Sequence, residues 1–393
     1  MGAHQASAVW LPVGQTLAAT ATAKYQFGKS VTFTLEAQAP PERSIEEATL
    51  FIRREQSPSA VAIPVAVQTD SALTASYQLD LVAEPLAPFT TVTYWWAIRD
   101  DEGQRYSVAQ QTLEYRDDRF AWEALEESSV TVYWAGQPQA IAQAALDQAQ
   151  AARAELARVF PQEEDVAFQV YIYPSLADMQ SALRLTGREY VGGHVFPEND
   201  VLLVWADNPR LATTELGQSV AHELSHLLMY RLVGADYWRV PRWFDEGVAT
   251  HFEPSPRPED ELLLREAATN RELIPFDALC QTFPVQPDRL AYAQSASLID
   301  YIEREYGTSA LNTMARAAAD GADCRTITTR GLGIELEELE SNWRREWVPG
   351  PLVELSSRRI VWIILVGAGF LLMLFLIQFR LNDEQTAARQ SRL

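Results

Sequence analysis

Two histidines of the sequence stand four residues apart with a glutamate between them, in His222-Glu223-Leu224-Ser225-His226. On a helix, residues i and i+4 share one face, so both imidazoles can bind one metal ion. Zinc favours this donor type, and Glu223 stands where a carboxylate reaches a metal-bound water without ligating the metal. The motif is short, and two histidines that face solvent or join a core polar network are the alternative. The chain has only 5 histidines, so the spacing favours a metal site.

A catalytic zinc ion needs three protein ligands and one open position, so a third ligand must lie outside this motif. The metzincin pattern would place another histidine six residues further on, but that position is Leu232. Glu246 comes 20 residues after the second histidine, and a turn near Gly234 would return a second helix that carries it to the metal. Asp245 and His251 are rival ligands. On that helix Asp245 would point about 100° away, and His251 lies roughly a turn and a half further on.

The residues around Glu246 form a second motif, which is longer than the one that contains the two histidines. Residues 241–249 read Pro-Arg-Trp-Phe-Asp-Glu-Gly-Val-Ala, and with the preceding His-Glu-Leu-Ser-His motif they resemble the gluzincin family of peptidases, in particular its bacterial peptidase MA-like group. Softer similarities are the segment Tyr292–Leu298 and the spacing of Gly333, Leu339 and Trp343. The resemblance covers about residues 130–348 and implies an α+β metallopeptidase domain there.

The resemblance assigns roles residue by residue. It implies that His222, His226 and Glu246 bind Zn2+ and that Glu223 is the general base. The implied activity is that of a zinc peptidase, which hydrolyses the bonds of a peptide or protein substrate with a zinc-activated water. We interpret the chain as a membrane-anchored endopeptidase. Thermolysin-like members place an aspartate four residues after the third ligand to orient a histidine, but here that residue is Thr250. The sequence therefore leaves open what orients the two histidines.

Further residues are candidates for contact with the substrate. Tyr292 is a candidate second donor to the developing oxyanion, with a core aromatic residue as the alternative, because its helix is amphipathic. Substrate backbone usually binds as an added strand along a sheet edge, and 191–196 or 201–205 would form that edge. Gly193 would permit close approach of the substrate. His194 would be a polar substrate contact, or otherwise a loop or edge histidine.

Other functions stay open on the sequence. Glu198-Asn199 loosely resembles an element with which related aminopeptidases grip a free amino terminus, although the flanking Pro197 and Asp200 indicate a turn. A zinc aminopeptidase is therefore one alternative. Another is a non-enzymatic, membrane-tethered binding module that uses its β-domain, although neither a zinc ligand nor the base is missing. The ligand set also fits a zinc hydrolase whose substrate is not a peptide.

The elements that would position these residues change character near residue 117. We predict a disordered lead over 1–24 and an all-β immunoglobulin- or fibronectin-like sandwich over 25–116, because about seven short β-rich runs alternate with turn residues. Over 118–350, a small sheet with helices and then a nearly all-helical half predict the peptidase-like domain. The expected elements there are helix 140–160, strands 166–173, 190–196 and 201–205, and helices 214–233, 243–252, 275–279, 289–306, 309–319 and 335–347.

Residues 360–379 contain no charged residue, and at about 1.5 Å per residue they would reach roughly 30 Å, the thickness of the bilayer core. Arginines flank the segment on both sides, at 358, 359 and 380. We therefore predict a single-pass transmembrane helix over 360–379, followed by a short tail over 380–393. The flanking charges are nearly balanced, so the orientation depends on the acidic body and the sandwich. These favour a cell-membrane protein with an extracytoplasmic catalytic domain and a cytoplasmic tail.

The overall charge excludes one class of partner. The chain has 32 Lys and Arg against 53 Asp and Glu, a net charge of −21, so no basic face for nucleic acid is expected. Its two cysteines, Cys280 and Cys324, are too few for a cysteine-rich metal site. They would form a disulfide outside the cytoplasm, and two free buried thiols are the alternative. Nothing in the sequence indicates an oligomeric state.

Overall fold

A computed structural model of the chain describes most of its folded part. The described residues are 18–38, 43–54, 57–69, 73–161, 166–183, 192–208, 212–255, 257–281, 283, 289–348, 362, 364–366 and 368–377. Residues 1–17 of the predicted lead and the predicted tail 380–393 lie outside them, and so do 190–191 of the predicted strand 190–196.

The N-terminal part has two β-sheets that form a sandwich, as its short β-rich runs between turn residues predicted. One sheet has the order β1-β2-β6-β5, and the other has the order β4-β3-β7-β8 with β9 also paired to β7. The strands are β1 Ala19–Gln26, β2 Ser30–Ala37, β3 Ile45–Arg54, β4 Val61–Val65, β5 Val67–Thr69, β6 Leu73–Asp80, β7 Thr90–Asp100, β8 Arg105–Ser107 and β9 Gln111–Tyr115. The predicted lead 1–24 was too long, because β1 begins at Ala19 and pairs along its whole length with β2.

The predicted catalytic part begins with a five-stranded sheet of order β10-β11-β12-β14-β13, whose three central strands are parallel and whose two edge strands are antiparallel. Its strands are β10 Glu123–Glu127, β11 Val130–Trp134, β12 Phe168–Tyr173, β13 His194–Phe196 and β14 Val201–Trp205. The sequence left two segments open as the substrate-binding edge. Of these two, β14 is flanked on both sides, and among the described residues β13 pairs with β14 alone, so β13 stays the candidate edge.

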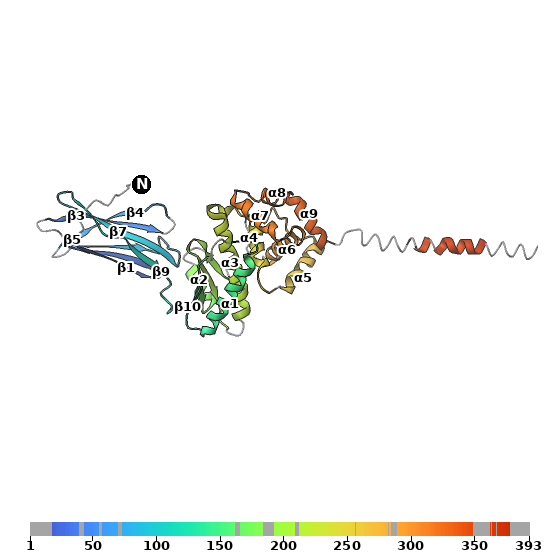
Figure 1. The fold of residues 1–393 in the computed structure, drawn as a ribbon, viewed down its shortest axis with the longest axis horizontal. Coiled ribbons are helices and arrows are strands. Elements are labelled where there is room, and N and C mark those ends of the chain that lie inside the picture. The colour runs from blue at the N-terminus through green and yellow to red at the C-terminus, as the bar shows by residue number, and fades with distance from the viewer. Residues whose placement is uncertain are drawn as a thin grey trace, which may run out of the picture.

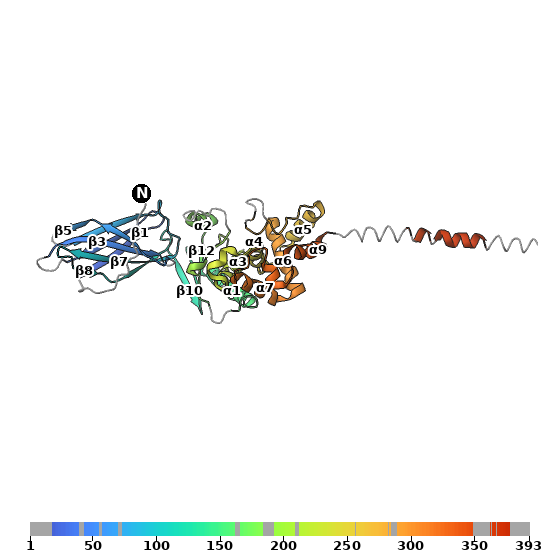
Figure 2. The ribbon, with the colours of Figure 1, turned by 90° about the horizontal axis from the view of Figure 1, so that it is seen from above.

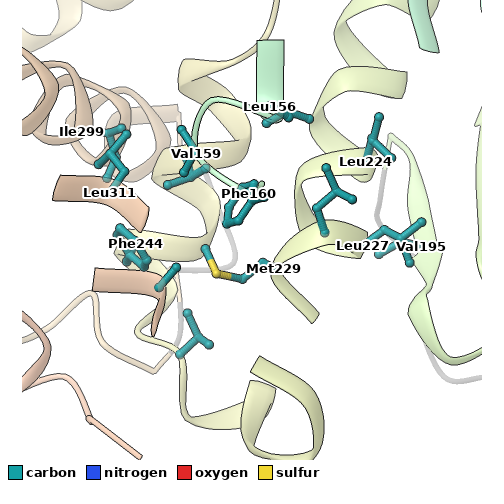
Figure 3. Packing of buried hydrophobic residues seen from close by; sticks show 14 of the residues in the cluster. Leu156, Val159, Phe160, Val195, Leu224, Leu227, Met229, Phe244, Ile299 and Leu311 are labelled. Carbon is teal, nitrogen blue, oxygen red and sulfur yellow. The ribbon is translucent and has the colours of Figure 1, made fainter. Parts of the chain in front are cut away.

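Different elements pack against the two faces of this sheet. Helices α1 Gln139–Leu156 and α3 Ala212–Val233 pack on one face, against side chains such as Val170, Ile172 and Leu202. On α3, Leu224 and Leu227 lie on the side toward Val195 of β13 (Figure 3).

The opposite face of the sheet packs against the sandwich and shares its apolar core. Its residues Tyr171, Tyr173 and Leu203 form one apolar cluster with sandwich residues and with α2 Leu176–Leu183. Figures 1 and 2 show the sandwich and the catalytic part side by side, joined at the sheet. Phe89 of the sandwich lies with its ring centroid 3.9 Å from that of Tyr171. The buried carboxylate of Asp117, at the junction, accepts a hydrogen bond of 3.1 Å from Tyr173. The two parts therefore share an apolar core.

The second half of the catalytic part is helical, as predicted. Its α-helices are α4 Arg242–His251, α5 Pro258–Asn270, α6 Arg289–Tyr306, α7 Thr308–Ala319, α8 Ile327–Leu332 and α9 Leu336–Trp347. Two of them, α5 and α8, were not predicted. The predicted helix 275–279 was wrong, since residues 276–280 form turns. There Phe276 packs between Trp243 and Trp343, and its N–H donates to Glu340, so tertiary contacts override local helical preference.

Cys280 and Cys324 form a disulfide with their Cα atoms 5.7 Å apart. The bond ties the turn segment before α6 to the segment between α7 and α8. The same turn holds the first residues of α4, because the Arg242 and Trp243 N–H groups donate to the carbonyls of Cys280 and Leu279 at 2.8 and 3.0 Å. Since α4 has no side-chain cap, these carbonyls satisfy two of its free N-terminal donors.

In the part of the chain that the structure describes, no helix is both long enough and apolar enough to cross a membrane. Of the predicted span 360–379, residues 362, 364–366 and 368–377 are described, and all of them are helical. The other residues of the span lie outside the described part. The transmembrane helix therefore stays a prediction.

The shared core yields a prediction on stability. Replacement of Phe89 by Ala should lower the free energy of unfolding by about 3–5 kcal/mol, because a large buried ring is removed from the junction. Urea unfolding, followed by fluorescence and circular dichroism, should show the catalytic part destabilised together with the sandwich. Val82→Ala is the matched control, since Val82 is 78% exposed and its loss should change stability by less than about 0.5 kcal/mol. An unchanged transition for the catalytic part of the Phe89 variant would contradict a shared core.

Candidate metal centre

Helix α3 presents the two histidines on one face, as their spacing predicted. Its opposite faces are fixed in the core, because Val220, Leu224 and Leu227 are completely buried. The chain then turns through a 3-10 helix, Gly234–Arg239, whose first residue has φ +71°, a left-handed conformation that glycine adopts readily. Helix α4 runs back from residue 242 and brings Glu246 to the histidines.

The three predicted ligands meet. His222, His226 and Glu246 each offer one ligand atom, and these atoms all lie within 4.8 Å of one another. Glu246 Oε2 lies 3.2 Å from Nε2 of His222 and 3.6 Å from Nε2 of His226. Neither rival joins them: Asp245 contacts the far nitrogen of His226, and Nε2 of His251 pairs with Glu303 at 2.8 Å.

Two carboxylates that the sequence analysis did not assign orient the imidazoles. Nδ1 of His222 lies 3.1 Å from Glu253 Oε1, and Nδ1 of His226 lies 2.9 Å from Asp245 Oδ1. A proton on each Nδ1 donates to its carboxylate, which leaves each Nε2 lone pair directed at the common point. Thr250, at the position of the thermolysin-type aspartate, has no such contact. The signal for Glu253 was its spacing, seven residues or about two helical turns after Glu246.

Further residues hold these carboxylates. The Tyr237 hydroxyl donates to Asp245 Oδ2 at 2.9 Å, and Arg257 pairs with Glu253 at 2.6 Å. Arg242 pairs with Oε1 of Glu246 and lies 3.5 Å from Oδ2 of Asp245. None of these three residues was predicted, because neither their type nor their spacing in the sequence is specific.

The donor set fits a divalent cation. Four carboxylates, those of Glu223, Asp245, Glu246 and Glu253, are at most 7% exposed, and they are met by the guanidinium groups of Arg242 and Arg257. With neutral imidazoles, four negative and two positive charges leave −2, which one Zn2+ neutralises. Oε2 of Glu246 is buried without a hydrogen-bond partner, although it faces both Nε2 atoms. Such an orphaned acceptor between two imidazoles is what a metal ligand requires.

Glu223 lies beside this group and outside it, as expected of a base. It is 7% exposed, and burial raises the pKa of its carboxyl, while the charges of His222 and His226 act in the opposite direction. The edge strand approaches it closely. A Cβ added to Gly193 would lie 2.5 Å from Glu223 Oε1, so only glycine fits here without displacing the carboxylate.

The two other predicted substrate contacts differ in their exposure. The Tyr292 ring, on α6, has its centroid 6.5 Å from that of His222 and is half-buried, so it borders the metal centre. His194 is only 6% exposed and packs edge-on against Phe196 within β13. That packing agrees with the alternative of an edge histidine. Glu198, by contrast, lies exposed in a 3-10 turn, Pro197–Asn199, as its flanking residues indicated.

The carboxylates around His222 lead to a prediction on pH. Burial would lower the pKa of His222, but Glu246 and Glu253 raise it to about 9 in the metal-free chain. The imidazole is therefore protonated at neutral pH, and zinc must displace that proton. The affinity for zinc, measured by competition with a chromophoric chelator, should rise from pH 7 to about 9. An ordinary histidine, with a pKa of about 6.5, would give a constant affinity above pH 7.5, and such a plateau would contradict the prediction.

The sequence of this part of the chain matches one known superfamily. The sequence profile of the Peptidase MA superfamily matches residues 131–349, and no curated protein matches the chain. Among solved structures, a mutant M1 zinc metallopeptidase from Deinococcus radiodurans is 13% identical, with a TM-score of 0.37 over 83% of this chain and 92% of that one. An aminopeptidase N family protein from Idiomarina loihiensis is 11% identical, with a TM-score of 0.37 over 84% and 76% of the two chains. The superfamily profile covers more than half of the 393 residues, and the chain therefore belongs to the Peptidase MA superfamily.

Proposed function

We propose that this chain is a zinc-dependent endopeptidase. The observation that carries the proposal is the convergence of His222, His226 and Glu246, with a buried carboxylate, Glu223, beside them and outside the ligand group. The three ligands would hold one zinc ion. When bound, zinc supplies Lewis acidity that activates water and polarises a substrate carbonyl.

The residues of the chain would divide the remaining work. Glu223 accepts a proton from the attacking water and passes it to the leaving nitrogen, so it acts first as a base and then as an acid. Its raised pKa suits a group that must both take up and release a proton. The Tyr292 hydroxyl donates a hydrogen bond to the carbonyl oxygen as negative charge develops there.

The side of β13 that faces away from β14 binds the substrate backbone as an added strand. This edge suits a peptide substrate, because its backbone groups repeat those of a strand. Gly193 keeps the approach to Glu223 open, since its missing side chain leaves room for both the carboxylate and the substrate. His194 lies in the same strand and helps to fix its position.

The position of Glu198 favours an endopeptidase over an aminopeptidase. It is exposed in the turn Pro197–Asn199, whereas the ligands His226 and Glu246 and the base Glu223 are buried. An exposed carboxylate in a surface turn is poorly suited to hold a free amino terminus beside a buried metal centre.

The cellular placement is also a proposal. The apolar segment 360–379 would anchor the chain in the cell membrane, with the tail 380–393 in the cytoplasm and the catalytic part outside it. The disulfide between Cys280 and Cys324 supports this orientation, because such bonds persist in oxidising compartments.

The proposed function predicts the behaviour of a Glu223→Gln variant. The variant should bind about one zinc per chain, like the native protein, because Glu223 is not a ligand. Its cleavage of an unfolded protein should fall about 10²–10⁴-fold, because the amide cannot take up a proton. Zinc analysis and a fluorescent peptide assay measure the two effects, and amino-terminally acetylated peptides distinguish endopeptidase from aminopeptidase activity. Native-like cleavage by the variant would remove Glu223 from the mechanism.

A second prediction concerns the glycine pair of the edge strand. Gly193→Ala should lower cleavage about 10²-fold, because its methyl group must push the Glu223 carboxylate out of place. Zinc binding should remain. Gly192→Ala is the matched control, since an added Cβ at Gly192 meets nothing within 4 Å. Equal activities of the two variants would show that the close approach at residue 193 has no part in catalysis.

A further inference from the structure

Arg242 gives the two oxygens of Glu246 separate partners. It is the first residue of α4, one helical turn before Glu246, and its side chain is 44% exposed. Its Nη2 pairs with Oε1 of Glu246, while Oε2 faces the imidazoles of His222 and His226. The carboxylate is therefore held in one rotation about its last side-chain bond.

We propose that Arg242 is a positioning residue of the metal centre, which holds Glu246 as a ligand through Oε2 alone. The inference rests on the proposed zinc site. It concerns a residue that pairs with the carboxylates of the site, and it explains why a carboxylate with two equivalent oxygens presents one of them to the imidazoles.

A free glutamate would not keep this arrangement. The terminal torsion of its side chain is soft, and either oxygen or both can ligate a cation. The guanidinium prevents this because it is itself fixed. Its Nη1 lies 3.5 Å from Asp245 Oδ2, and the backbone N–H of Arg242 donates to the carbonyl of Cys280 at 2.8 Å. A planar fork with several donors can serve both carboxylates, which the point charge of a lysine cannot do.

The geometric role and the charge of Arg242 predict opposite effects on zinc. A positive charge close to the ligands repels a cation, so if Arg242 acted only through its charge, its removal would strengthen zinc binding. If it acts by holding Glu246, its removal weakens binding, because the carboxylate must then be ordered by the metal itself. The sign of the change in affinity therefore separates the two roles.

The test compares Arg242→Met and Arg242→Lys with the native chain. Chelator competition should show zinc affinity reduced about 10–100-fold in the methionine variant, the range found for residues that orient metal ligands. The lysine variant should also bind more weakly, because it keeps the charge and loses the fork. The visible spectrum of the cobalt(II)-substituted methionine variant should change in intensity, because Glu246 is then free to ligate through both oxygens.

Arg304→Met is the matched control. Arg304 is 47% exposed and pairs with Asp300 four residues away on α6, at 2.9 Å, which is far from the ligands in sequence and not part of their network. This variant should bind zinc like the native chain. A double-mutant cycle adds a second check. In a Glu246→Gln background, Arg242→Met should cause no further loss of affinity, since the arginine acts through the residue already changed.

The outcomes are distinguishable. A native chain that binds no zinc would overturn the proposed function itself. Native zinc binding, with equal or tighter binding by Arg242→Met, would overturn only the positioning role. If circular dichroism shows that the methionine variant does not fold, the lysine variant decides, and native affinity in that variant would likewise overturn the inference.

Discussion

The burial of negative charge is the constraint on which the metal centre depends. Four carboxylates lie almost fully buried within two neighbouring helices and the segment after them, and an isolated charge in such surroundings is strongly destabilising. The fold meets this constraint by pairing. Arg242 pairs with Glu246 and lies close to Asp245, Arg257 pairs with Glu253, and Tyr237 donates to Asp245. The imidazoles of His222 and His226 contact these same three carboxylates. With both imidazoles neutral, as metal binding requires, two negative charges remain unpaired where the three ligand atoms converge.

Close packing of the helices keeps those groups in register. Gly247 follows the third ligand, and a Cβ there would lie 2.9 Å from the carbonyl oxygen of Ser295 on α6. The missing side chain lets α4 rest directly on the helix that carries Tyr292. On the other side, α3 is fixed by apolar residues against the sheet, with Leu227 beside Val195 of the edge strand (Figure 3). The ligands, the base and the edge strand are thus held by one continuous packing arrangement.

The three candidate metal ligands could be predicted from the sequence, because their spacing follows the period of an α-helix. The pair His222 and His226 needs only the period of a helix, and Glu246 needs only a helix that returns after Gly234. The roles of the two carboxylates that orient the imidazoles, Asp245 and Glu253, could not be predicted in this way. Asp245 entered the sequence analysis only as a rival ligand, since spacing gives the direction of a side chain and not the nitrogen that it meets. Arg242 could not be assigned, because an arginine one turn from a glutamate is common on any exposed helix.

The fold, like the site, has elements that local sequence patterns predict and elements that they do not. The apolar strands β12 and β14 and the long helices were placed well. The strands β10 and β11 were missed, and the short helix α8 and the turn around Phe276 depend on contacts between residues distant in the chain. The place of β13 at the end of the described sheet also follows only from strand order, which hydrophobic patterns do not encode.

The packing of the sandwich on one face of the catalytic sheet limits which N-terminal domains could replace it in evolution. The sandwich covers the apolar side chains of Tyr171, Tyr173 and Leu203. The N-terminal β-region therefore completes the packing of the catalytic sheet in addition to forming its own fold. Recombination that exchanged this region for an unrelated one would expose those side chains to water. The new partner would have to supply a matching apolar surface, which makes wholesale replacement harder than the linear order of the two regions suggests.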